Sequence, residues 1–308
     1  MSSVLSNISE DVDRLILSVR GLSFQYKGKS VFKNIDLDIN EPGIYGLIAP
    51  NGFGKTTFLN VISGLLPYQQ GTIELLGERL SRKVAFHSIC FTQDSSMLYD
   101  YLSAYDHLKF YCEQYKIGQE KIEDVTRFLN MASYYKKPVR TYSMGMKQRS
   151  LLAIALLSES DILLLDEPLN GLDPTSTILI REAILKIAEA GRTVIVSSHN
   201  LDEIDKITNN ILFINDQNIW LENMQAYHQT FVELELEAEE YQRASDLFER
   251  IGLETSHLHN SLIINSPSVS GAEIINSLID HQIYIKNFNK RISGSEQRYK
   301  ALYEVKNL

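Results

Sequence analysis

Residues 142–173 read YSMGMKQRSLLAIALLSESDILLLDEPLNGLD, and this stretch constrains the fold more than any other part of the chain. Ser143 and Gly145 open a predicted helix, and the apolar run ILLL predicts a buried strand that ends at two adjacent carboxylates, Asp166 and Glu167. The residues after them predict a tight turn with a further carboxylate. Two carboxylates behind a buried strand carry a large desolvation cost unless a cation or a water network uses them. A structural ion pair is the alternative that these residues leave open.

Apolar strands separated by helices predict the fold class. The runs GIYGLIA, ILLL and TVIVSS do not alternate with polar residues, which is typical of a parallel sheet covered by helices on both faces. Asn51, Gln93, Asp166 and His199 each fall at or just past the end of a predicted strand. Because ligands bind at the carboxyl ends of the strands in such sheets, one pocket can collect these four side chains.

The strand GIYGLIA runs directly into a glycine-rich loop, PNGFGKTT, and the residues FLNVISGLL after the loop predict a helix. In this arrangement, backbone N–H groups and the helix N-terminus bind phosphate. The strict sequence pattern of such a phosphate-binding loop begins with glycine, where this chain has Ala49. Phe53 stands where a small residue is usual. Neither change removes a backbone donor. A decayed loop that binds no nucleotide is the alternative.

Together these motifs resemble those of an ABC ATPase cassette. Residues 142–173 resemble the signature, the Walker B motif and the D-loop of that family, and the loop that starts at Ala49 resembles its Walker A motif. The resemblance implies an α/β P-loop NTPase fold with a RecA-like parallel sheet core, an antiparallel β arm and a helical subdomain. The segment GTIELLGERL, which predicts a small hairpin, suits the arm.

The resemblance also implies ATP and Mg²⁺ as ligands and gives each site residue a role. Glu167 is implied to act as the general base on the attacking water, Gln93 to reach metal and water, and His199 to contact the γ-phosphate. Tyr26 stands where the family places an aromatic residue that stacks on adenine, although Phe24 and Tyr26 are equally compatible with strand residues that pack on a sheet. The implied phosphate-binding residues are Ala49, Pro50, Asn51, Gly52, Phe53, Gly54, Lys55, Thr56 and Thr57, and the implied metal ligands are Thr56, Gln93 and Asp166.

The sequence YSMGM at residues 142–146 departs from the family's commonest signature, Leu-Ser-Gly-Gly-Gln, but retains Ser143 and Gly145. A serine hydroxyl, a bare backbone and a helix N-terminus that can face phosphate therefore remain. In ABC cassettes the signature faces the ATP bound by a second cassette, so these two residues are implied to complete the partner's site in a homodimer or a heterodimer. The variant resembles cassettes that serve a permease on a separate chain, including drug, bacteriocin-immunity and polysaccharide exporters.

We expect three parts along the chain. Residues 1–13 predict a flexible lead-in, and residues 14–225 predict the cassette, with its helical subdomain at about 97–155. Residues 226–308 read as strand, helix, strand, helix, strand and a last helix, and they predict a small α+β accessory domain. A set of extensions packed on the main core is the alternative for this last part.

Composition narrows the function classes. A formal charge of -9 disfavours a whole surface that binds nucleic acid, and the two cysteines have no metal-binding spacing. We see no signal peptide and no apolar run of the roughly 20 residues that a membrane-spanning helix needs. These features predict a cytoplasmic protein that lies on the membrane surface. Residues 97–116 are rich in aromatic rings, which suits either a permease interface or the packing of the helical subdomain.

The leading hypothesis is therefore the ATP-binding and ATP-hydrolysing subunit of a membrane exporter. One alternative is a soluble ABC ATPase that acts on ribosomes or DNA, although such proteins usually carry tandem cassettes or a long coiled coil. The other is a regulatory, weakly hydrolysing cassette. Neither tandem cassettes nor a heptad run is visible in this sequence.

Overall fold

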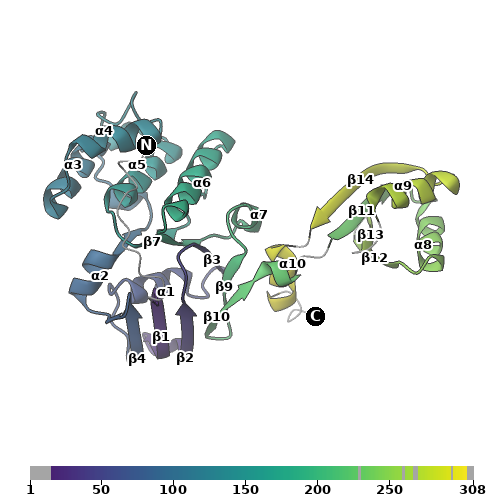
Figure 1. The fold of residues 1–308 in the computed structure, drawn as a ribbon, viewed down its shortest axis with the longest axis horizontal. Coiled ribbons are helices and arrows are strands. Elements are labelled where there is room, and N and C mark those ends of the chain that lie inside the picture. The colour runs from purple at the N-terminus through teal and green to yellow at the C-terminus, as the bar shows by residue number, and fades with distance from the viewer. Residues whose placement is uncertain (1–14, 228–229, 259–260, 266–269, 293, 304–308) are drawn as a thin grey trace. The chain divides into compact units, whose positions relative to one another are not determined.

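The computed structural model describes residues 15–227, 230–258, 261–265, 270–292 and 294–303, so the predicted lead-in lies outside the described residues. The chain divides into two compact units (Figure 1). The first takes the chain up to Asn223 together with its end from Leu302, and the second runs from Met224 to Ala301.

The first unit is built on a six-stranded sheet in the order β10-β9-β3-β8-β7-β6. Five of these strands are parallel, and β10 joins as the antiparallel partner of β9. The strands β3 and β8 are buried along their whole length, because helices such as α1 and α6 cover the sheet. The predicted parallel sheet is thereby confirmed. The strands are β3 (Ile44–Ile48), β6 (Ile89–Thr92), β7 (Ile162–Asp166), β8 (Thr193–Ser197), β9 (Asn210–Asn215) and β10 (Asn218–Asn223).

The antiparallel arm is a second sheet of the same unit, in the order β2-β1-β4-β5. Its inward side chains join one core with those of the central sheet and of α1, in which the rings of Phe32 and Phe58 meet edge to face with centroids 6.0 Å apart. The predicted hairpin forms β4 and β5. The elements are β1 (Leu17–Tyr26), β2 (Lys29–Ile39), α1 (Lys55–Ile62), β4 (Gln70–Leu75), β5 (Glu78–Arg79) and α2 (Arg82–Ser88).

A region of helices follows β6. Its longest helix before the signature begins at a capping box, in which the Ser103 hydroxyl accepts a hydrogen bond from the Asp106 backbone and the Asp106 carboxylate accepts one from the Ser103 backbone. The hydrogen bond with Ser103 also lowers the pKa of Asp106. The elements are η1 (Ser95–Met97), α3 (Ala104–Tyr115), α4 (Glu120–Phe128), η2 (Val139–Thr141) and α5 (Met144–Leu157).

The helix after the predicted turn begins and ends at residue types that favour helix ends. α6 (Pro174–Glu189) has Asp173 as its N-cap, whose side chain accepts a hydrogen bond from the backbone of Ser176 at 3.0 Å. Gly191 follows the helix with φ of 82°. The strand β8 comes next, and the short helix α7 (Leu201–Asp205) follows it.

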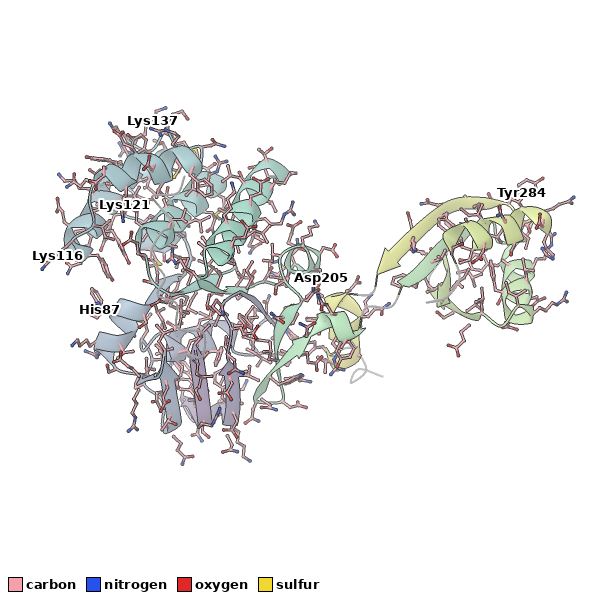
Figure 2. All side chains as sticks on the ribbon, viewed as in Figure 1. His87, Lys116, Lys121, Lys137, Asp205 and Tyr284 are labelled. Atoms are coloured by element: carbon pink, nitrogen blue, oxygen red, sulfur yellow. The ribbon has the colours of Figure 1, made fainter. Side chains whose placement is uncertain are left out.

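The second unit contains a four-stranded antiparallel sheet in the order β12-β13-β11-β14 and the helices α8 and α9. Its βαββαβ order is that of a split βαβ fold around its own apolar core. The sequence did not predict β12, because ETSHL is a polar edge strand without a clear alternation. Tyr284, just before β14, is 75% exposed (Figure 2). The elements are η3 (Met224–Tyr227), β11 (Thr230–Leu236), α8 (Tyr241–Arg250), β12 (Glu254–Leu258), β13 (Ser261–Asn265), α9 (Gly271–Asp280) and β14 (Ile285–Ile292).

Two further features of the described chain bear on function. α10 (Ser295–Tyr303) is shared between the units, since Leu302 and Tyr303 belong to the first. Among the residues that the structure describes, no helix is both long and apolar enough to span a bilayer.

Candidate active site

The loop between β3 and α1 has the backbone of a phosphate cradle. Gly52 and Gly54 have φ of 83° and 107°, a region that glycine adopts without strain. A Cβ on Gly54 would lie 2.9 Å from the nearest side-chain atom of Val31 and 3.0 Å from the ring of Phe32. Among the described residues, no side chain caps the N-terminus of α1, so its first N–H groups remain suited to an anion. The loop that the sequence predicts therefore forms despite Ala49 and Phe53.

Lys55 is the buried cation of this loop. Its side chain is only 8% exposed, and its ammonium donates a hydrogen bond to the Ala49 carbonyl at 2.7 Å. The same nitrogen lies 4.0 Å from the Glu167 carboxylate. Burial lowers the pKa of Lys55, and the carboxylates of Glu167 and Asp166 oppose that shift. A phosphate group at this place would add the negative charge that favours the ammonium form.

Asp166 joins the loop to the central sheet. Its carboxylate accepts a hydrogen bond from the Thr56 hydroxyl at 2.7 Å and a second one from the Ser197 hydroxyl. Thr56 and Asp166 are two of the three predicted metal ligands, and the fold brings them into direct contact although 110 positions separate them in the sequence. A carboxylate and a hydroxyl oxygen are the ligand types that Mg²⁺ prefers, so the donor set fits that ion.

Glu167 is held in an unusual backbone conformation for its residue type. Its φ is 51°, and its backbone N–H donates to both the hydroxyl and the carbonyl of Ser197, at 2.9 and 3.2 Å. A non-glycine residue with positive φ persists only where its surroundings hold it. Ser197 is completely buried at the end of β8, where it binds both neighbouring acidic residues. Sequence reasoning missed Ser197, and its only signal was its place at the end of an apolar strand.

The Glu167 side chain also contacts His199. Its carboxylate lies 2.9 Å from Nδ1 of the imidazole, and the His199 side chain is 53% exposed. Lys55, Glu167 and His199 thus form one continuous series of contacts, and Glu167 and His199 lie just past the carboxyl ends of β7 and β8. The series contains a cation, a carboxylate and an imidazole.

The Gln93 side chain has a protein partner in this structure. Its amide donates to the side chain of Asn60 at 2.9 Å, and the amide of Asn60 donates to the Thr56 carbonyl at 2.7 Å. Asn60 therefore links Gln93 to the phosphate loop. Sequence reasoning missed Asn60, because a polar residue within a helix gives no local indication of a partner 33 positions away.

Tyr26 and Phe24 have different surroundings at the end of β1. Phe24 is buried in the core, whereas Tyr26 is 57% exposed and carries the Lys27 ammonium 5.7 Å from its ring centroid. A face of an exposed ring can stack on a base. The sequence alone did not distinguish the two residues, but the difference in burial shows that Tyr26 and not Phe24 has an exposed ring.

The signature residues are tied to α6. Ser143 is the exposed N-cap of α5, and its hydroxyl accepts a hydrogen bond from the Met146 backbone at 3.3 Å. Gly145 is buried, and a Cβ there would lie 2.6 Å from the hydroxyl oxygen of Ser176. Arg149 donates to that same hydroxyl at 2.8 Å. Within the described chain, the hydrogen bonds of Ser143 stay in its own first helical turn.

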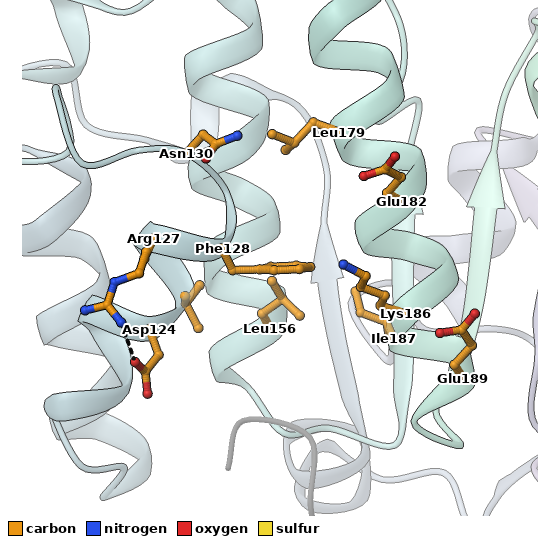
Figure 3. A pocket seen from close by; sticks show the side chains of 11 residues that line it. Asp124, Arg127, Phe128, Asn130, Leu156, Leu179, Glu182, Lys186, Ile187 and Glu189 are labelled. Atoms are coloured by element: carbon orange, nitrogen blue, oxygen red, sulfur yellow. Dashed lines mark ion pairs between the residues drawn. The ribbon is translucent and has the colours of Figure 1, made fainter. Parts of the chain in front are cut away.

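Two cavities lie near these elements. One of about 430 Å³ contains His199, Arg181 and the turn Asn170–Leu172. The other, of about 660 Å³, lies between α4, α5 and α6 and contains none of the predicted site residues (Figure 3). In it the Lys186 ammonium stands 4.9 Å from the ring centroid of Phe128. The first cavity is therefore the one that adjoins His199 and its contact with Glu167.

Sequence comparisons agree with the motifs. A model of the ABC transporter family matches residues 32–170. The chain is 31% identical over 299 residues to YcbN, an ABC transporter ATP-binding protein of Bacillus subtilis strain 168, and the match covers 92% of this chain and 95% of YcbN. It is 33% identical over 207 residues to SrtF, a lantibiotic transport ATP-binding protein of Streptococcus pyogenes, covering 67% of this chain and 90% of SrtF.

Solved structures show the same fold. The ATP-binding subunit of an ABC transporter superposes with a TM-score of 0.63 at 20% sequence identity. The match covers 86% of this chain and 99% of that subunit. At this identity the likeness concerns the fold, which is the α/β cassette that the motifs predict.

Proposed function

This chain belongs to the family of ABC transporter ATP-binding proteins, and we propose that it powers an exporter whose permease is a separate chain. It is an ATPase subunit that binds ATP and hydrolyses it to drive transport. The observation that carries the proposal is the series of contacts from Lys55 through Glu167 to His199 beside the phosphate loop. Export is favoured by the relationship to SrtF, which is a lantibiotic transport protein.

Phosphate binding is the task of the loop and of Lys55. The backbone N–H groups of the loop and the N-terminus of α1 present positive potential, and the buried ammonium adds a full charge. The Lys55 ammonium lies 4.0 Å from the Glu167 carboxylate, so the phosphate-binding cation is next to the proposed base. Tyr26 is proposed to bind the adenine through its exposed ring.

Glu167 is proposed as the general base. Its backbone is fixed by Ser197, and its carboxylate is oriented by His199, so the group that accepts the proton of the attacking water has little freedom. His199 is exposed on its other side and is proposed to reach the γ-phosphate. Gln93 is proposed to act on the same region through its hydrogen bond to Asn60, which in turn donates to the Thr56 backbone carbonyl.

The metal ligands proposed for Mg²⁺ are Thr56 and Asp166, with Gln93 as a third. The contact of the Thr56 hydroxyl with the Asp166 carboxylate supports this set, and Ser197 holds the carboxylate in place. When bound, Mg²⁺ neutralises phosphate charge and so stabilises the transition state of phosphoryl transfer.

A second cassette is proposed to complete the site. Ser143 is exposed at the N-terminus of α5, in a position to bind a phosphate that the partner holds. ATP would then contact both chains only in a closed dimer, so its binding shifts the population towards closure and its hydrolysis releases the dimer.

The permease is proposed to bind the helical region from the cytoplasmic side of the membrane. Met97, Tyr99, Tyr101 and Phe110 are 46%, 60%, 72% and 67% exposed, although this stretch also contributes buried side chains such as Leu108. Large exposed rings in one region are typical of a protein interface. Purification of the tagged chain from membranes of its host tests whether it has such a partner. We expect it to co-purify with a membrane protein that spans the bilayer several times and has no cassette of its own.

The substitution Glu167→Gln tests the catalytic part of the proposal. The amide cannot accept a proton, so we expect kcat to fall by at least about 100-fold while ATP still binds and traps the closed dimer. Steady-state ATPase assays and analytical ultracentrifugation with ATP measure the two effects. Glu189→Gln, at an exposed glutamate near the end of α6, is the matched control and should behave as the wild type. A Glu167→Gln protein that hydrolyses ATP at the wild-type rate removes Glu167 as the base.

A further inference from the structure

The end of α10 is attached to the sheet edge from which the phosphate loop leaves. The Tyr303 hydroxyl donates a hydrogen bond to the Ile214 carbonyl at 2.7 Å and lies 3.4 Å from the Ile48 carbonyl. Ile48 is the last residue of β3, directly before the loop, and β9, which contains Ile214, pairs with β3. The amide of Asn215 also donates to the Leu302 carbonyl at 3.2 Å. Three contacts therefore fix the last two described residues of the chain at this edge.

The ring of Tyr303 contacts the loop itself. It meets the ring of Phe53 edge to face, with centroids 5.7 Å apart and planes at 89°. The Phe53 backbone N–H donates to the Pro50 carbonyl at 3.4 Å, which closes the turn inside the loop. The side chain of Phe53 is thus anchored by Tyr303 while its backbone forms part of the phosphate cradle.

This contact accounts for an irregular residue in the motif. A small residue is usual at position 53, and a phenylalanine there leaves an apolar ring on a loop that is otherwise glycine-rich and polar. Phe53 is 41% exposed even with Tyr303 against it. Edge-to-face aromatic pairs favour a defined geometry beyond the simple burial of surface. The two aromatic residues are complementary, although 250 positions of the chain separate them.

We propose that Tyr303 is a positioning residue of the nucleotide site, which holds the phosphate-binding loop through Phe53 in its binding conformation. The contacts of Tyr303 described above are with Phe53 and with the carbonyls of Ile48 and Ile214, at the loop and the sheet edge behind it, so we expect its effect to fall on nucleotide binding rather than on the chemical step. The chain end after the accessory unit thereby becomes part of the ATP site. The inference deepens the ATPase function and rests on it.

Steady-state ATPase kinetics of the full chain test this role. We expect Tyr303→Ala to raise KM for ATP about fivefold with kcat within about twofold of the wild type, because it removes the ring contact and the hydroxyl together. Tyr303→Phe keeps the ring and should raise KM only about twofold. Direct titration with ATP and Mg²⁺ measures whether the affinity changes in parallel. Nucleotide binding by the wild-type chain in the same titration checks the ATPase function separately.

A double-mutant cycle shows whether the effect passes through Phe53. In a Phe53→Ala background the ring partner is absent, so Tyr303→Ala should change KM less than it does in the wild type. Tyr284→Ala, at an exposed tyrosine of the second unit, is the matched control and should leave KM unchanged (Figure 2). A purely structural role would lower the melting temperature and the active fraction, and hence kcat, without raising KM. A lower melting temperature and kcat without a higher KM would overturn the proposal. So would an unchanged KM in Tyr303→Ala, or a change in KM of equal size with and without Phe53.

Discussion

Gly145 illustrates how one residue of a motif serves its own chain. The motif suggests that its bare backbone faces a phosphate of the partner, yet Gly145 is buried against the start of α6. The hydroxyl of Ser176, which Arg149 and the Asp173 carboxylate also bind, occupies the place that a side chain would need. The absence of a Cβ at residue 145 is therefore required within the subunit, whatever the partner adds.

This packing predicts a stability effect for Gly145→Ala. A Cβ 2.6 Å from the Ser176 hydroxyl forces a shift of α5 or α6, so we expect a loss of about 1–3 kcal/mol in the free energy of unfolding. Chemical denaturation without nucleotide measures it. Met144→Ala, at a half-exposed side chain of the same helical turn, should change stability little. A stable Gly145→Ala protein that only loses dimerisation would contradict the packing role.

Ser197 shows a second kind of residue, one that positions two others. It donates to the carboxylate of Asp166 and accepts from the backbone of Glu167, so one buried hydroxyl orients the proposed metal ligand and the proposed base. Fixing both groups before ATP binds reduces the entropy that catalysis must otherwise overcome.

Among the elements, α3 begins at a capping box. Ser103 and Asp106 exchange hydrogen bonds across its first turn, and the hydrogen bond with Ser103 lowers the pKa of Asp106. A carboxyl group whose pKa is lower in the folded state contributes stability above its unfolded pKa. That contribution disappears as the pH falls through the folded pKa, because both states are then protonated. The helix with the exposed Phe110 is thus stabilised by charge at neutral pH.

The capping box predicts a pH-dependent effect of Ser103→Ala. We expect a loss of about 1 kcal/mol in the free energy of unfolding at neutral pH. The difference from the wild type should shrink below about pH 4, near the unfolded pKa of aspartate, where the carboxylate of Asp106 becomes protonated. Urea denaturation from neutral to acidic pH measures it. Ser256→Ala, on the exposed side of β12, is the control. If the loss in free energy of unfolding stays the same at every pH, the charge of Asp106 does not contribute to it.

For the whole molecule, the residues that we propose for the ATP site, including Tyr303, belong to the first unit, although Tyr303 follows the second unit in the sequence. The second unit has its own core of apolar side chains from β11, β13, α8 and α9, but the chain returns to the first unit at Leu302. We therefore expect a protein that lacks residues 226–308 to show a KM for ATP raised at least as far as in Tyr303→Ala, because Tyr303 is lost as well.

The same deletion tests the role of the accessory domain, which we propose contributes to dimer contact or regulation. Sedimentation of the Glu167→Gln protein with ATP, with and without residues 226–308, measures the dimer. A weaker ATP-bound dimer supports the proposal. Unchanged dimerisation and ATPase activity in the shortened protein would exclude both this role and that of Tyr303.

The sequence by itself determined the parts of this protein whose physics is local. The positive φ values at Gly52 and Gly54, the buried strands β3, β7 and β8, and the cap of α6 at Asp173 follow from residue type and spacing, since each depends on a few neighbouring residues. For the same reason the phosphate loop and the Walker B carboxylates could be predicted. The polar edge strand β12 could not, because pairing with β13 rather than its own pattern makes it a strand.

Only the tertiary structure decided which distant side chains meet. The links of Asn60 with Gln93, Ser197 with both carboxylates, and Tyr303 with Phe53 each join segments far apart in the chain. Such a contact leaves no periodicity or spacing in the sequence, because it forms when the sheet order brings the carboxyl ends of β3, β6, β7, β8 and β9 to one edge. The sequence therefore identified the chemistry of the site, and the packing of the sheet and of the chain end determined how its residues are held.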